Sequence, residues 1–282
     1  MAGVNLYYNY FVPQNPVRAS EVLSCLAVAL SDPTFTRIVL LAEPGCAAPV
    51  GGKCSVWPST SRPLIADYFE AVRGTSANDD VNVIINSDCF LDPRTSGRVQ
   101  RVRAGEACCL SRVELESIVP LRENRTLTRQ LRPVRYAMQD CWIFRGKPRD
   151  GMFLDYPLGR LGCDNRLAYE LKSAGYEITD RYRQLRLMHY HVSQARNWTA
   201  ADRVPEPYAF PPKPFDQRLL DRLIHTTKQV KRWLGASPEE SATDYLKVID
   251  SESRSSERDK SQAVVPRVSE TLAAGRDTQP PR

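Results

Sequence analysis

The chain has 282 residues, of which 42% are hydrophobic and 26% are charged, so it can bury the core of one large domain or of two small ones. Its net charge of +6 suits an anionic partner such as a nucleotide phosphate, but the sequence lacks the dense basic clusters that are typical of a nucleic-acid-binding protein. No apolar stretch approaches the roughly 18–20 residues that cross a bilayer, and the first residues lack the basic flank and long apolar core of a signal peptide.

The cysteines indicate a reducing compartment. Most of the 8 cysteines lie in apolar or strand-like contexts, and no CxxC pair occurs. We therefore expect reduced, mostly buried thiols in a cytoplasmic protein. A disulfide between Cys46 and Cys54 stays open.

The first half of the chain alternates strands and helices. With right-handed crossovers, this order predicts an α/β fold of Rossmann type, with a mostly parallel central sheet covered by helices on both faces. No GxGxxG or GxxxxGK[ST] motif occurs, which argues against NAD-dependent dehydrogenases and P-loop enzymes. The expected elements are a strand at 4–11, a helix capped at Ser20, a buried strand at 37–42, a loop at 44–62, a helix opened by Pro63, and a buried strand at 81–85.

Three polar residues directly follow the strand at 81–85: Asn86, Ser87 and Asp88. In open α/β sheets, ligands bind beyond the carboxyl ends of the strands. A carboxylate at that edge, with a polar neighbour two residues earlier, presents oxygen atoms to a hard cation such as Mg²⁺ or Mn²⁺. The alternative for Asp88 is the cap of a turn or helix.

The second half contains further strands and a pair of histidines. We expect short strands at 107–110 and 141–145, a helix ending near Gly175, and closing strands at 176–179 and 186–192. Alternation places His189 and His191 on the same face of the last strand. Taken alone, two histidines on one strand indicate a hydrogen-bonded structural pair.

The character of the sequence changes after Trp198. Residues 205–214 hold five prolines in ten positions, and the helix expected from Asp216 to Leu234 carries five Lys/Arg against two Asp. Such a basic amphipathic helix lies on an anionic membrane, on a partner or on its own domain. The predicted organisation is a domain at 1–200, a Pro-rich linker at 201–215, a basic amphipathic helix at 216–235, and a mostly disordered tail at 236–282.

Several motifs occur together in one known family. The sequence resembles nucleotide-sugar-dependent glycosyltransferases of the GT-A fold. It is most similar to the compact single-domain group that includes the amino-terminal glycosyltransferase domain of a multidomain chlorella virus protein. The resemblance spans roughly residues 3–198, and it rests on Asn5-Leu6-Tyr7-Tyr8-Asn9, Asn86-Ser87-Asp88, Leu110-Ser111-Arg112, Gln139-Asp140-Cys141-Trp142-Ile143-Phe144, Pro157-Leu158-Gly159-Arg160-Leu161-Gly162-Cys163-Asp164-Asn165 and His189-Tyr190-His191.

The resemblance implies a metal site. Asp88 would anchor Mn²⁺ or Mg²⁺ against the donor diphosphate, and His191 or His189 would complete the site. Asn86 stands where the DxD-type site of the family has its first acid, which weakens the expected metal affinity.

The resemblance also implies a catalytic base and donor contacts. Asp164 would take the proton of the acceptor hydroxyl, as inverting transferases require, unless it is only a helix cap. Asp140 competes for this role, or binds donor sugar hydroxyls together with Gln139. The remaining donor-binding candidates are Arg18 and Arg112 for the diphosphate, and Asn5 and Tyr7 for the base or ribose of the nucleotide.

The expected function is therefore a cytoplasmic, metal-assisted hexosyl- or deoxyhexosyltransferase. It would move a sugar from a nucleotide-sugar donor to a glycan or glycolipid acceptor with inversion, without a nucleic-acid partner, and with peripheral membrane contact through residues 216–235 as an option. The main alternative is a catalytically silent nucleotide-sugar-binding or scaffold module. A sugar nucleotidyltransferase shares the sheet architecture, but no Gly-rich triphosphate loop follows the first strand.

Overall fold

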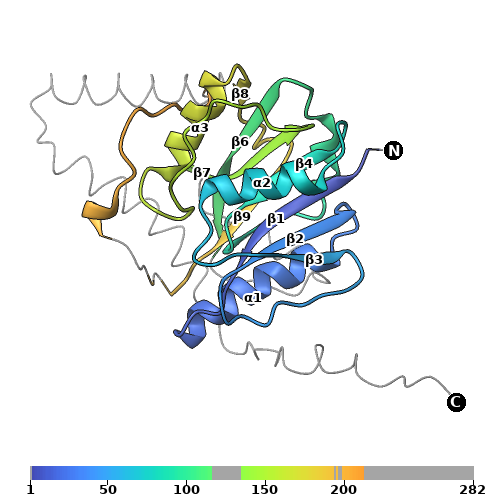
Figure 1. Ribbon diagram of the computed structural model, residues 1–282, viewed down its shortest axis with the longest axis vertical. Coiled ribbons are helices and arrows are strands. Elements are labelled where there is room, and N and C mark those ends of the chain that lie inside the picture. The colour runs from blue at the N-terminus through green and yellow to red at the C-terminus, as the bar shows by residue number, and fades with distance from the viewer. Residues whose placement is uncertain (1, 116–134, 194, 196–198, 213–282) are drawn as a thin grey trace, which may run out of the picture. The chain divides into compact units, whose positions relative to one another are not determined.

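The computed structural model describes residues 2–115, 135–193, 195 and 199–212. The helix expected at 216–235 and the tail expected at 236–282 lie outside the described residues, and the domain boundaries stay predictions. In the described part of the chain, one sheet carries three α-helices (Figure 1). The strands are β1 (Val4–Tyr10), β2 (Arg37–Ala42), β3 (Cys54–Pro58), β4 (Val81–Ile85), β5 (Cys89–Leu91), β6 (Glu106–Leu115), β7 (Arg135–Arg145), β8 (Glu177–Thr179) and β9 (Leu187–Tyr190).

The sheet is parallel in one half and mixed in the other. Its described strands follow the order β3-β2-β1-β4-β7-β6-β9-β5, and β8 pairs with β6. Strands β3, β2, β1 and β4 are mutually parallel, while β7 runs antiparallel to both β4 and β6. Because β9 is parallel to β6, the carboxyl ends of β1, β4, β6 and β9 all meet one edge of the sheet. The polar residues that follow β4 therefore lie near the carboxyl ends of β6 and β9.

Helices cover both faces of this sheet, as the α/β prediction requires. Helix α1 (Pro16–Ser31) packs Leu26 and Ala29 into the core on one face. Helices α2 (Ile65–Thr75) and α3 (Cys163–Ser173) pack on the other face, where α2 crosses the strands in Figure 1. Full burial of β4 on both faces explains its run of apolar side chains. The predicted fold class is confirmed.

Helix α1 begins earlier than the sequence predicted. Asn15, not Ser20, is the N-cap, and its side chain accepts hydrogen bonds from the backbone N–H groups of Val17 and Arg18. Pro16 occupies the first helical position, where its fixed φ favours a helix and its missing N–H costs nothing. The prediction followed the apolar residues, which begin a full turn later. The extra turn brings Arg18 into the helix.

Two strands, β3 and the three-residue β5, were not predicted. Residues 44–62 were expected to form a loop, but β3 lies within them and pairs in parallel with β2. Strand β3 is at the edge of the sheet, and its side chains are largely exposed. An exposed edge strand carries no continuous apolar run, so the pattern that revealed β1, β2 and β4 was absent.

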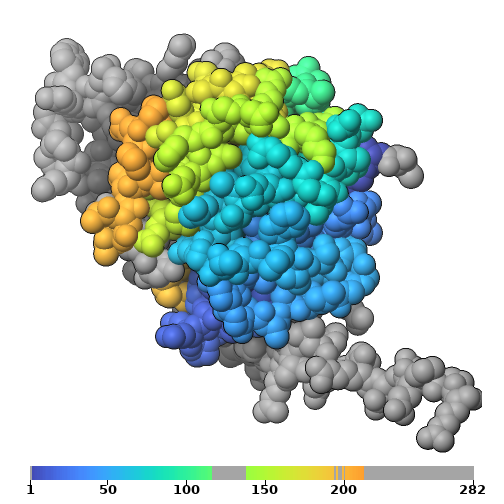
Figure 2. Space-filling view, in the orientation of Figure 1, coloured from blue at the N-terminus to red at the C-terminus, as the bar shows by residue number. Residues whose placement is uncertain are grey.

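Residues 199–212 pack on the side of α3. The backbone N–H of Val204 donates to Leu161 O at 2.9 Å, and that of Ala209 donates to Asn165 O at 3.0 Å. Arg166 in α3 donates to the carbonyl oxygens of Pro205 and Glu206. In Figure 2 this segment, in orange, covers one flank of the yellow-green region that includes α3.

A substitution at Gly162, the residue before α3, tests how closely this packing constrains the start of the helix. The φ of this glycine is +83°, and an added methyl group would lie 2.7 Å from Tyr208 Oη and 3.2 Å from Val204 O. We expect Gly162→Ala to lower the free energy of unfolding by about 2–4 kcal/mol, because backbone strain and a steric clash add together. Chemical denaturation measures the effect.

Gly151 provides the matched control for that substitution. Its φ is +82°, but nothing lies within 4 Å of an added methyl group. Gly151→Ala therefore carries only the conformational cost of about 1–2 kcal/mol. Equal losses in the two variants would show that residues 204–208 do not hold the start of α3.

All eight cysteines are free thiols, so Cys46 and Cys54 are not bonded to each other. No helix within the described ranges is long and apolar enough to cross a membrane.

Candidate functional site

A cleft of about 550 Å³ opens beyond the carboxyl ends of the strands. Side chains reach it from α1, from the residues that follow β4 and β9, from β6 and β7, and from the loop before α3. Its size falls within the range of about 300–1,000 Å³ that is usual for small-molecule sites. Eight of the residues expected at the functional site line it: Arg18, Asn86, Asp88, Arg112, Asp140, Asp164, His189 and His191.

Asp88 lies at the centre of a charged cluster at one end of the cleft. Its Oδ2 accepts a hydrogen bond from Arg18 at 2.7 Å and lies 3.2 Å from His189 Nε2 and 3.6 Å from His191 Nδ1. The residue is buried, which by itself would raise its pKa, but the charges and hydrogen bonds of His189 and Arg18 hold the pKa of Asp88 well below its ordinary value. Asp88 is therefore ionised at neutral pH.

His189 lies between two carboxylates. Its Nδ1 lies 2.6 Å from Glu114 Oε2, on the side opposite Asp88. Burial acts to lower the pKa of His189, but the charge and hydrogen bond of Asp88 and the hydrogen bond to Glu114 outweigh it and raise the pKa to about 9. His189 in turn holds the pKa of Glu114 at about 2, against the opposing effect of burial. The strand pairing of β9 with β5 and β6 fixes the position of this imidazole.

His191 reaches the same carboxylate from just beyond β9. Its ring meets that of His189 edge to face, with centroids 5.6 Å apart, and its Nε2 lies 3.0 Å from Ala195 O. Asp88, His189 and His191 each offer one ligand atom, and these atoms lie within 4.8 Å of one another. One carboxylate oxygen and two imidazole nitrogens form a donor set that fits a divalent metal ion, provided that the ion displaces the proton which the raised pKa keeps on His189 at neutral pH.

A second set of ion pairs lies next to the first. Arg112 donates to Glu114 Oε1 at 2.9 Å and to Asp140 Oδ2, so Glu114 connects the two sets. Asn86 donates from Nδ2 to the other oxygen of Asp140. An aspartate at position 86 would place two carboxylates in contact, so the amide here orients Asp140 instead of adding charge.

Asp164 lies in the first turn of α3 and lines the same cleft. It is half-buried, and its Oδ2 accepts a long hydrogen bond of 3.4 Å from the backbone N–H of Gln139. Burial, followed by the negative charge of Asp140, raises the pKa of Asp164 to about 6. A carboxylate with this pKa is a good proton acceptor near neutral pH.

Three of the expected site residues do not line the cleft. Asn5 and Tyr7 lie toward the other edge of the sheet, because β1 continues to Tyr10 before it ends. Asn5 donates to Asp80 Oδ2 at 3.0 Å, and the Tyr7 hydroxyl lies 2.9 Å from Thr75 Oγ1. The β1 residue at the cleft is instead Asn9. The side chain of Gln139 is fully buried, and its backbone N–H donates to Asp164 Oδ2.

Two acidic residues of the cluster, Glu114 and Glu21, were not expected from the sequence. Glu114 follows Arg112 by two positions in β6, so alternation places both on the same face of the strand, and this signal was available. Glu21 lies in α1 and is 1% exposed. Its pairing with Arg18, three positions earlier in the same helix, was a local signal that the expected helix start at Ser20 hid, whereas its contact with Ser193 arises only through the fold.

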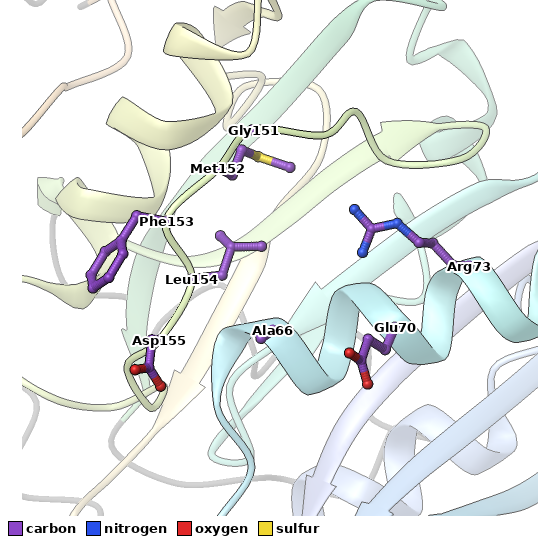
Figure 3. A pocket seen from close by; sticks show the side chains of 8 residues that line it. All are labelled: Ala66, Glu70, Arg73, Gly151, Met152, Phe153, Leu154 and Asp155. Carbon is purple, nitrogen blue, oxygen red and sulfur yellow. The ribbon is translucent and has the colours of Figure 1, made fainter.

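A second, smaller hollow of about 350 Å³ lies between α2 and residues 151–155. In Figure 3, Met152 and Leu154 point toward α2, whereas Phe153 points to the other side. Glu70 and Arg73 of α2 face this hollow, and none of the expected site residues lines it. We assign it no role in the chemistry.

No protein-family model and no curated protein matches the sequence. Among solved structures, the chain is similar to mannosyltransferase PcManGT from Pyrobaculum calidifontis in complex with GDP-Man and Mn²⁺, at 12% identity and a TM-score of 0.39 over 69% of this chain and 58% of that chain. It is also similar to GalNAc-T7 with UDP, GalNAc and Mn²⁺, at 9% identity and a TM-score of 0.41 over 67% of this chain and 43% of that chain.

A third similar structure is 2-C-methyl-D-erythritol 4-phosphate cytidylyltransferase from Francisella tularensis, at 13% identity and a TM-score of 0.35 over 64% of this chain and 90% of that chain. The present chain thus spans 58% and 43% of the length of the two glycosyltransferases. At these identities and scores, the similarity concerns only the general arrangement of strands and helices.

Proposed function

We propose that this chain is a glycosyltransferase that moves a sugar from a nucleoside diphosphate donor to a hydroxyl of a glycan or glycolipid. The observation that carries the proposal is the convergence of Asp88, His189 and His191 with Asp164 in one cleft. An ion site for the departing diphosphate and a separate carboxylate for the incoming hydroxyl are the two parts that direct displacement needs.

In this proposal, Asp88, His189 and His191 hold a divalent cation. When bound, that cation neutralises the charge that develops on the departing diphosphate. Mg²⁺ prefers oxygen ligands, so two imidazole nitrogens favour Mn²⁺ over Mg²⁺. Glu114 contacts the far nitrogen of His189 at 2.6 Å and fixes the orientation of its ring.

Asp164 is the general base. It accepts the proton of the acceptor hydroxyl as that oxygen attacks the anomeric carbon, and the displacement inverts the configuration there. Its raised pKa of about 6 keeps it deprotonated at neutral pH while leaving it basic enough to accept the proton.

The acidic residues and arginines that pair in the cleft bind the donor. Asp140, oriented by Asn86 and Arg112, lies beside the cation ligands and accepts hydrogen bonds from hydroxyls of the donor sugar. The guanidinium groups of Arg18 and Arg112 provide forked hydrogen bonds for the diphosphate. We infer that a hexose or deoxyhexose is transferred.

The test is turnover of nucleotide sugars by the purified full-length protein. With Mn²⁺ present, we expect hydrolysis or transfer from at least one UDP-, GDP- or dTDP-sugar, and we expect EDTA to reduce it to background. Release of the nucleoside diphosphate is the readout. A screen of the same donors by thermal shift identifies the one that binds.

Binding and release assays on the same protein separate the alternatives. Nucleotide-sugar binding that ignores both Mn²⁺ and EDTA, without turnover, would identify a silent binding module. Release of pyrophosphate from a nucleoside triphosphate would identify a nucleotidyltransferase. The cytoplasmic location, the membrane contact through residues 216–235 and the closer resemblance to the chlorella virus domain stay predictions.

A further inference from the structure

Arg18 joins two carboxylates at the edge of the cleft. One terminal nitrogen lies 2.7 Å from Asp88 Oδ2, and the other lies 2.9 Å from Glu21 Oε2. The Arg18 side chain is 16% exposed, and those of Asp88 and Glu21 are 10% and 1% exposed. Ion pairs this well shielded from water are strong, so Arg18 has a defined position in the protein without ligands.

The guanidinium group of Arg18 contacts the same carboxylate oxygen that a cation would need. Oδ2 of Asp88 is the same oxygen that lies 3.2 Å from His189 Nε2 and 3.6 Å from His191 Nδ1. A divalent ion coordinated by this oxygen and the imidazoles would lie against the guanidinium nitrogen, and the two like charges would repel each other. Arg18 and the metal ion therefore compete for Asp88.

Glu21 determines where the Arg18 side chain would remain if its contact with Asp88 were broken. Glu21 is held in place by the backbone N–H of Ser193 at 2.6 Å and the Ser193 hydroxyl at 3.0 Å. It contacts the terminal nitrogen of Arg18 that does not bind Asp88, so this contact would persist if the contact with Asp88 were broken. Arg18 lines the cleft, so the released nitrogen faces the space where a diphosphate would bind.

We infer that Arg18 is an exchange group. It neutralises Asp88 in the ligand-free protein and transfers to the diphosphate when a divalent cation takes its place on Asp88, with Glu21 as the pivot. This inference rests on the proposed function for the identity of the anion. The exchange makes the binding of cation and diphosphate mutually favourable. The cation frees Arg18 to contact the diphosphate, and the diphosphate draws Arg18 away from Asp88, which leaves this carboxylate to the cation. The coupling is reciprocal.

The test uses the full-length protein with Mn²⁺ alone and then with inorganic pyrophosphate, and it measures affinity by calorimetry. We expect Arg18→Met to bind Mn²⁺ alone about tenfold more tightly than the wild-type protein, because the competitor is gone. We expect the same variant to bind Mn²⁺-pyrophosphate about tenfold more weakly, because a phosphate contact is gone. A merely structural arginine would not give changes of opposite sign.

Arg62→Met is the matched control. Arg62 lines the same cleft, but it donates to the carbonyl oxygen of Leu158 and not to Asp88. Its substitution should leave the affinity for Mn²⁺ alone unchanged. Thermal unfolding confirms that each variant is folded, and Arg18→Gln, which can still donate to Glu21, replaces Arg18→Met if the latter is not.

Two results would overturn the inference. One is an affinity for Mn²⁺ alone that is equal or weaker in the Arg18 variants than in the wild-type protein. The other is that neither protein binds Mn²⁺. Neither readout depends on turnover, so a protein that shows the exchange but transfers no sugar would contradict the proposed function and leave the exchange standing.

Discussion

Asp164→Asn is expected to lower the rate of sugar transfer by about 10²–10⁴-fold, the usual contribution of a general base. Asparagine has nearly the same shape and keeps an oxygen for the Gln139 N–H, but it cannot accept a proton. The donor is bound by other residues, so its affinity should change by no more than a few-fold. Steady-state kinetics with the donor found by thermal shift measures both quantities.

The pH dependence of the rate distinguishes a base from a group that only positions the acceptor. Since a general base acts in its deprotonated form, the wild-type rate should rise with pH through the Asp164 pKa of about 6 and level off above it. In Asp164→Asn this rise should disappear from the residual rate. An unchanged turnover, or an unchanged pH profile in the variant, would remove Asp164 from the mechanism.

The same substitution should stabilise the protein at high pH. Because burial raises the pKa of Asp164 above its unfolded value, the ionised carboxylate opposes folding. This penalty is absent below about pH 4, develops as the pH rises toward the folded pKa, and is complete above about pH 6. The melting temperature of Asp164→Asn should therefore exceed that of the wild-type protein at pH 8 and equal it at pH 4.

Asp155→Asn provides the control for these measurements. Asp155 belongs to the hollow beside α2 and not to the cleft. Its replacement removes one carboxylate from the same protein without touching the proposed base. It should leave the rate and its pH profile unchanged. A comparable loss of turnover in this variant would show that the effect of Asp164→Asn is not local.

The parts of the fold that the sequence revealed are those with continuous apolar strands. Strands β1, β2 and β4 lie inside the parallel half of the sheet, and burial on both faces makes their sequences apolar throughout. The polar residues after β4 then mark the edge where the cleft lies. Edge strand β3 has no such pattern, and only its pairing with β2 defines it.

Several of the expected site residues that line the cleft are carried by local motifs. Asp88 follows a strand directly, and His189 and His191 alternate along one. Asn5 and Tyr7 lie within β1, which runs from Val4 to Tyr10, and their side chains contact Asp80 and Thr75 instead of the cleft. Glu21 pairs locally with Arg18 in α1, but its contact with Ser193, 172 positions away, comes only from α1 meeting the residues after β9.

The second large effect is expected at Asp88. Asp88→Asn removes the only carboxylate among the three described candidate ligands, so the affinity for Mn²⁺ should fall by at least tenfold. With the cation weakly held, the transfer rate should fall by about 10³-fold, since the charge on the departing diphosphate is then poorly neutralised. Calorimetry with Mn²⁺ and the turnover assay measure the two losses.

Asp88→Asn also disturbs the ion pairs of the cleft. Arg18 and His189 both lose a charged partner, and the removal of one member of a buried ion pair costs about 3–5 kcal/mol when nothing compensates. Glu21 and Glu114 remain to pair with them, so the loss should be smaller. Reduced stability alone lowers turnover at the assay temperature, and this effect has to be separated from the loss of the cation.

Asp92→Asn makes that separation. Asp92 is 2% exposed and pairs with Arg94 at 2.7 Å, so it is another buried, paired aspartate, but it lies outside the cleft. Its replacement should lower the melting temperature without changing the affinity for Mn²⁺. If Asp88→Asn behaves in the same way, then Asp88 serves only as a partner for Arg18 and His189. If only Asp88→Asn loses affinity for Mn²⁺, the carboxylate of Asp88 serves to bind the cation. Arg18 and His189 then pair with it only until the cation binds.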